Sequence, residues 1–144
     1  MNRTSSYGQR GFGLIEILVS MLVLGIGILG MVGLQLNAMK FNHTAAVRTQ
    51  ATFLAYDISD RMRANRIRAR AGDYDIALTG SAPSGTSTAA VDLQQWKAAL
   101  SSQLPAGTGA IARASSGNVT ITVQWDEGRS GGSSSQQFVF ETRL

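Results

Sequence analysis

The stretch RGFGLIEILVSMLVLGIGILGMVGLQ, from Arg10 to Gln35, decides the fold of this chain of 144 residues. Between Phe12 and Leu34 its only ionisable side chain is Glu16. The part from Ile17 to Leu34 is about 18 apolar or small residues, close to the minimum length of a helix that crosses the apolar core of a bilayer. We therefore expect a single membrane-spanning helix with one carboxylate near its start.

A short basic segment, MNRTSSYGQR, precedes this stretch and carries Arg3 and Arg10 but no acidic residue. Such a segment followed by an apolar run is typical of a secretory leader. A cut after the apolar run would need a small-x-small site, and the residues there match it poorly. A cut between Gly11 and Phe12 would instead leave the apolar helix on the mature chain. It would also lower the formal net charge from +4 to +2, because both arginines are removed.

The helical pattern continues beyond the apolar stretch. Apolar residues recur at steps of three and four on one face, and neither proline nor glycine occurs between Leu34 and Ala71. We expect one helix from about Gly13 to about Arg70, apolar on all sides over residues 12–35 and amphipathic over residues 36–71. Gly72 is its expected C-terminal stop. The positions on the apolar face are Met39, Val47, Ala51, Leu54, Ile58 and Met62.

Residues 72–144 form a small head of mixed structure. Turn-rich residues 73–90 predict a connecting loop, and the apolar spacing over residues 91–104 predicts a short helix. Alternation of apolar and polar residues then predicts three antiparallel strands. We expect an α+β fold in which this small sheet buries one face on the amphipathic half of the long helix. The expected strands are residues 110–115, 118–126 and 136–144, and the expected packing residues are Tyr74, Ile76, Leu78, Leu93, Trp96, Leu100, Leu104, Val119, Ile121, Val123 and Trp125.

The composition excludes several functions. The chain has no cysteine, so it forms neither a thiolate metal site nor a disulfide. His43 is the only histidine and has no second ligand at metal-site spacing. The serines have no histidine or lysine partner in a known catalytic pattern. We expect no metal, no cofactor and no catalysis.

The run DRMRANRIRAR places five arginines at the end of the long helix. Asp57 can pair with Arg61, and Asp60 with Arg63, at helical spacing. No aromatic residue is interleaved in the run to stack the bases of a nucleic acid. We therefore favour a solvated face or a contact with a partner subunit over nucleic acid binding. The candidate residues for a contact with a partner subunit or an anion are Arg61, Arg63, Arg66, Arg68 and Arg70.

The start of the chain resembles a type IV prepilin. It has a basic leader that ends in Gly11, an aromatic Phe12, and Glu16 at the fifth position after the cut, and GFGLIE departs from the commonest form of this motif at Gly13 alone. The segments DISDRMRANR (residues 57–66) and VTITVQWDE (residues 119–127) extend the resemblance. Over most of its length the chain is similar to minor pilins of the PilV type, also called type IV pilus modification proteins.

That resemblance implies a pilin-like fold and a series of processing steps. A prepilin peptidase would remove the leader, residues 1–11, and methylate the new amine of Phe12. The subunit would wait in the inner membrane, with a periplasmic head, until it joins other minor pilins and the major pilin. It would prime pilus assembly and sit in the tip complex at the cell surface, where an adhesin is a further candidate partner. Glu16 would be the assembly residue.

Glu16 also has a chemical reason to act in assembly. A carboxylate inside a bilayer is costly, so it is a functional candidate by default. Cleavage after Gly11 would place it in the first turn of the helix, where unpaired N–H groups favour a negative charge, and would create an ammonium at Phe12. That ammonium can pair with Glu16 of the same chain or of a neighbour, which would favour the correct stagger between subunits. The alternative is a carboxylate at the membrane edge with no partner.

Three other interpretations stay open. A pseudopilin of a type II secretion system shares the leader and the helix. A membrane-tethered module would capture DNA or another ligand through its arginine run. In the third interpretation, the chain is a single-pass protein in which Glu16 is incidental.

Overall fold

A long helix begins the part of the chain that the computed structural model describes, residues 13–144. This helix, α1 (Leu14–Ala64), is the expected one, and it contributes to both of the compact units into which the chain divides after Met39. In the second unit one face of α1 is buried, as its apolar spacing predicted. The buried residues are Ala51, Leu54, Ala55, Ile58, Ser59 and Met62, whereas Val47 is half-buried and Met39 is exposed.

The prediction of an uninterrupted helix to about Arg70 is wrong at one residue. α1 ends at Ala64, Asn65 leaves helical geometry with φ −115° and ψ 47°, and a short helix, α2 (Arg66–Ala71), follows. The Asn65 side-chain amide donates to the Tyr74 hydroxyl at 3.1 Å, a contact that the helical pattern does not encode. Asparagine is a weak helix former because its side chain competes for local hydrogen bonds, which makes this a favourable place for the break.

Gly72 ends α2 as predicted. It adopts the left-handed region, with φ 94°, and its N–H donates to the Ala69 carbonyl at 3.2 Å. The next N–H, of Asp73, donates to the Arg68 carbonyl at 3.1 Å. This pair of hydrogen bonds is a Schellman motif, which satisfies the last carbonyls of the helix and turns the chain back toward the core.

The second predicted helix, α3 (Thr88–Gln103), begins three residues earlier than expected. Its start is set by Ser87, whose hydroxyl accepts a hydrogen bond from the Ala90 N–H at 3.2 Å. Such an N-cap satisfies a backbone donor that the first turn leaves unpaired. The preceding loop is therefore shorter than residues 73–90, but it packs as expected: Tyr74 is buried, and Ile76 forms an isolated bridge to Ile111.

The three predicted strands form an antiparallel sheet in the order β1-β2-β3. Ile111 of the first strand lies opposite Ile121, which in turn lies opposite Phe140. Along the middle strand every second residue is buried, as the alternation predicted. The connection before the third strand holds one turn of 3-10 helix, η1 (Gly128–Ser130). The strands are β1 (Thr108–Arg113), β2 (Asn118–Trp125) and β3 (Gln136–Arg143).

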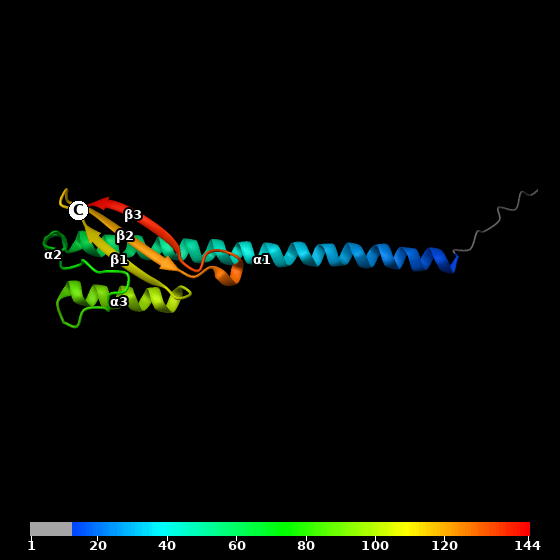
Figure 1. Ribbon diagram of the computed structural model, residues 1–144, viewed down its shortest axis with the longest axis horizontal. Coiled ribbons are helices and arrows are strands. Elements are labelled where there is room, and N and C mark those ends of the chain that lie inside the picture. The colour runs from blue at the N-terminus through cyan, green and yellow to red at the C-terminus, as the bar shows by residue number, and fades with distance from the viewer. Residues whose placement is uncertain (1–12) are drawn as a thin grey trace, which may run out of the picture. The chain divides into compact units, whose positions relative to one another are not determined.

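The core of the second unit lies between this sheet and two helices. Figure 1 shows α3 and the second half of α1 beside the sheet. The two helices are antiparallel, because Leu54 contacts Trp96 whereas Arg61, further along α1, contacts the earlier Asp92. The fold is thus the α+β, pilin-like arrangement that the sequence predicts: a long N-terminal helix, a short second helix and a small antiparallel sheet.

Candidate functional site

Glu16 lies in the first turn of α1, as the sequence predicted. Its backbone N–H donates to the Gly13 carbonyl at 2.9 Å, and its own carbonyl accepts a hydrogen bond from the Ser20 hydroxyl at 2.7 Å. The first turn of a helix favours a carboxylate because its N–H groups are unpaired and the helix dipole is positive there. Gly11 and Phe12, the predicted cleavage and methylation residues, lie outside the described residues, and the assembly role of Glu16 stays a prediction.

The first part of α1 is long and apolar enough to cross a membrane, by length and composition. Its large apolar side chains, from Leu14 to Leu36, are between 46% and 83% exposed. Four glycines add to this surface, and a Cβ atom built on any of them meets nothing within 4 Å. In a membrane, glycines of this kind allow the close approach of another helix. This segment therefore offers its whole circumference to lipid or to partner helices. The glycines are Gly25, Gly27, Gly30 and Gly33.

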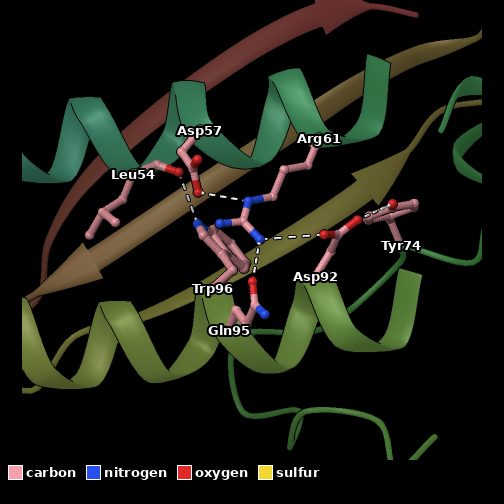
Figure 2. Close-up of polar contacts among 7 residues, drawn as sticks. All are labelled: Leu54, Asp57, Arg61, Tyr74, Asp92, Gln95 and Trp96. Atoms are coloured by element: carbon pink, nitrogen blue, oxygen red, sulfur yellow. Dashed lines mark hydrogen bonds and ion pairs between the residues drawn. The ribbon is translucent and has the colours of Figure 1, made fainter. Parts of the chain in front are cut away.

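Arg61, the first residue of the arginine run, joins α1 to α3 (Figure 2). Its Nε donates to Asp57 Oδ2 at 3.0 Å, which confirms the helical pair that the sequence predicts. Its Nη1 donates to Gln95 Oε1 at 2.7 Å and lies 3.4 Å from Asp92 Oδ1. These two acceptors come from α3, so only the fold brings them to Arg61.

The next arginine, Arg63, also binds within the head. Its Nη1 donates to Asp60 Oδ1 at 3.0 Å, the second predicted pair, and its Nη2 donates to the Thr142 hydroxyl on β3 at 2.9 Å. Arg66 is exposed on α2. The side chains of the run therefore do not form one uniform solvated stripe.

The last two arginines of the run contact the backbone and one nearby carboxylate. Arg68 Nη1 lies 3.6 Å from Asp73 Oδ2, just beyond the end of α2. Arg70 Nη2 donates to the backbone oxygen of Leu144 at 2.6 Å. Arg113 of β1 donates from Nη1 to the Arg70 carbonyl. The end of the run thus meets a further arginine, from a strand, which the sequence analysis did not associate with it.

Tyr74 fixes the loop after α2 to α3 (Figure 2). Its hydroxyl donates to Asp92 Oδ2 at 2.6 Å and accepts from Asn65 Nδ2 at 3.1 Å. Burial of the ring, reinforced by the hydrogen bond to the Asp92 carboxylate, raises the pKa of Tyr74 to about 12. The phenol therefore stays neutral at any physiological pH and acts as a structural donor.

Both tryptophans are core anchors, as the sequence predicted. Trp96 is fully buried, and its Nε1 donates to the Leu54 carbonyl at 2.9 Å (Figure 2). Trp125 is 3% exposed, and its Nε1 donates to Glu127 Oε1 at 2.9 Å. A buried indole N–H needs such an acceptor, because leaving it unpaired is costly.

Glu127 is a residue that the sequence analysis missed. Its side chain is 4% exposed and takes a two-point contact from Arg48 on α1, with Nε to Oε1 and Nη2 to Oε2 both at 2.9 Å. The Arg48 hydrogen bond holds the pKa of Glu127 below its ordinary value, even though burial opposes this. The pair ties the β2–β3 connection to α1. A serine- and glycine-rich linker gives no sign of a buried carboxylate, since its partner lies far away in the sequence.

In residues 13–144 no group of three histidine, cysteine, aspartate or glutamate side chains could hold a metal ion. His43 is exposed on α1. The described residues bring together ion pairs and hydrogen bonds that join elements of the head.

A family model described as the prokaryotic N-terminal methylation motif matches residues 7–32. No curated protein and no solved structure matches the chain. The matched residues include the predicted cleavage site and most of the apolar part of the helix, residues 12–35. They support a type IV pilin-like prepilin leader on a protein of the pilin or pseudopilin kind. The apolar N-terminal helix fits anchoring in the inner membrane.

Proposed function

We propose that this protein is a minor pilin of the PilV type. It is cleaved between Gly11 and Phe12, methylated on the Phe12 amine, and held in the inner membrane with its head in the periplasm. From there it joins other minor pilins in a complex that primes assembly of the pilus and stays at its tip. The observation that carries this proposal is the match of residues 7–32 to the methylation motif.

Two features of α1 support the proposal. The carboxylate of Glu16 lies in the first turn of α1, and in the sequence it follows by four residues Phe12, where cleavage would leave a new ammonium. Beyond it, the exposed apolar side chains and the four open glycines suit a helix that moves from lipid into a bundle of similar helices. Both features follow from the sequence of α1 itself and do not depend on the head.

In this account Glu16 sets the register between subunits. In a medium of low dielectric an unpaired carboxylate is strongly penalised, so a subunit inserts favourably only where its Glu16 meets an ammonium. The Phe12 ammonium exists only after cleavage, and methylation leaves its charge in place. Processing is therefore a precondition for assembly, and an unprocessed subunit would lack the cation that its neighbours need.

The register role is tested with Glu16→Ala in the full-length chain, expressed in a strain whose own copy is deleted. We expect normal leader cleavage but at least about a tenfold loss of the subunit from sheared pili, the effect of about 1.4 kcal/mol of lost pairing. Ser20→Ala is the matched control, because its hydroxyl bonds only to the backbone of the same helix. Equal incorporation of the two variants into pili would show that assembly does not need the carboxylate of Glu16.

The main rival function is that of a pseudopilin in a type II secretion system, which the methylation motif fits equally well. Deleting the gene separates the two functions. Loss of surface pili and of twitching motility supports the minor pilin. Loss of secreted enzymes with intact pili would assign the protein to the secretion system.

A further inference from the structure

A cavity of about 200 Å³ opens at one end of the sheet, next to α2. Three of the six residues that line it are arginines, and none of the six has an acidic side chain. The arginines come from three different elements: Arg70 from α2, Arg113 from β1 and Arg143 from β3. The remaining lining residues are Gly117, Val119 and Leu144.

Contacts within the head hold two of these arginines in place. Arg70 Nη2 donates to the backbone oxygen of Leu144, and Arg113 Nη1 donates to the backbone oxygen of Arg70. Arg113 Nε also lies 4.0 Å from Asp75 Oδ2, with both side chains over a third exposed, so that this pair neutralises little charge. A guanidinium carries five N–H donors, and these contacts use only a few of them.

Apolar residues in the wall of the cavity strengthen the attraction of the arginines for an anion. Val119 and Leu144 line the cavity and are buried in the core, so the cationic groups lie against apolar side chains. A charge interacts more strongly next to apolar surface, because less water screens it. Guanidinium groups recognise oxyanions through paired N–H donors, and three of them close together repel one another, which a bound anion would relieve.

We propose that Arg70, Arg113 and Arg143 bind one small oxyanion group, a phosphate or a carboxylate, in this cavity. The size of the cavity fits one such group, not a row of them. No aromatic residue lines it, so it lacks the stacking surface that single-stranded nucleic acids use. Of its three arginines only Arg70 belongs to the run in α1 and α2, where Arg61, Arg63 and Arg68 already meet carboxylates of the head. The proposal does not depend on the function in pilus assembly.

The test uses the full chain in a non-ionic detergent at constant ionic strength. Sodium phosphate and sodium acetate are titrated separately, and calorimetry and the NMR signals of the arginine Nε–H groups report binding. The tighter of the two anions identifies the ligand class. Arg143→Gln is the main variant, because Arg143 is exposed at the end of an edge strand and its loss should not unfold the head. Arg66→Gln is the matched control, since Arg66 is also exposed and does not line the cavity.

We expect saturable binding of at least one anion, which Arg143→Gln weakens about tenfold, whereas Arg66→Gln changes it less than about twofold. Arg143→Lys should restore only part of the affinity, because lysine keeps the charge but loses the paired donors. Absence of saturable binding by both anions would overturn the proposal. So would equal losses in the two glutamine variants, which would indicate general attraction to a basic head. A short DNA duplex that binds tightly, with equal dependence on Arg66 and Arg143, would also overturn it.

Discussion

Replacing Glu127 with glutamine tests the contact between the β2–β3 connection and α1. The carboxylate accepts two hydrogen bonds from Arg48 and one from Trp125, all at 2.9 Å, and its side chain is 4% exposed. Glutamine keeps the shape but offers only one oxygen, and its amide nitrogen faces an arginine donor. We expect the free energy of unfolding to fall by about 2 kcal/mol. This is less than two charge-assisted hydrogen bonds contribute, because the Arg48 side chain is 55% exposed and can bind water instead.

The assay is denaturant unfolding of the full chain in a non-ionic detergent, followed by tryptophan fluorescence. Both reporters, Trp96 and Trp125, are buried in the head. Glu141→Gln is the matched control, since it removes the same charge from an exposed position on β3 and should change stability by less than about 0.5 kcal/mol. If Glu127→Gln is no more destabilising than this control, the buried contact is not a source of stability.

The sign of the pH dependence sharpens this test. Arg48 holds the pKa of Glu127 below its ordinary 4.5. The contribution of Glu127 to the free energy of unfolding is therefore present above about pH 4.5 and is lost as the pH falls through the pKa of the folded protein. Arg48→Met should be more destabilising than Glu127→Gln at pH 7, because it leaves a buried carboxylate without its cation. Burial would then raise the pKa of Glu127, so the defect of Arg48→Met should shrink as the pH falls from 7 toward 4.5. A defect that grows over this interval would contradict the assignment.

Three further predictions concern the head. Gly109→Ala places a Cβ atom 2.5 Å from a ring carbon of Trp96, so we expect unfolding to become easier by about 1–3 kcal/mol, measured by denaturant unfolding. Gly72→Ala must hold φ 94°, and we expect a loss of about 1 kcal/mol in the same assay. Tyr74→Phe removes the hydrogen bond to Asp92 and should cost about 1–2 kcal/mol at pH 7. The pKa of Tyr74 is raised from 10 to about 12 in the folded protein, so its contribution to the free energy of unfolding should be lost as the pH rises from 10 to 12. Tyr74→Phe should not show this loss.

The sequence predicts those parts of the fold that depend on regular spacing. The apolar steps along α1 identify the buried face that carries Leu54 and Ile58, and the alternation in β2 identifies the buried row that carries Ile121 and Val123. Both patterns repeat over several turns or residue pairs, so no knowledge of distant residues is needed. The left-handed stop at Gly72 is equally local.

Features that depend on a single contact, rather than on a repeating pattern, could not be predicted. The break at Asn65 accompanies a hydrogen bond to Tyr74, which reaches this position only after the chain has turned back. The earlier start of α3 depends on a single serine hydroxyl, a weak signal in a segment full of serine and threonine. Glu127 is buried because Arg48 lies opposite it in the fold, and nothing near either residue in the sequence indicates this pairing.

Some parts of the candidate site follow from local sequence, and others are brought together only by the fold. The position of Glu16 in the first helical turn and its Gly11-Phe12 context follow from a short, local motif. The pairing of Asp57 with Arg61 follows from helical spacing. The cavity of Arg70, Arg113 and Arg143 is assembled from elements far apart in the chain.

Every assembly role proposed for this chain depends on its processing as a prepilin, which the mass of its N-terminal peptide reports. The protein is extracted from the membranes of cells that contain a prepilin peptidase, digested, and analysed by mass spectrometry. We expect an N-terminal peptide that begins with N-methylated Phe12. An N-terminus at Met1, or one created near Ala38 by cleavage after the apolar helix, would contradict it.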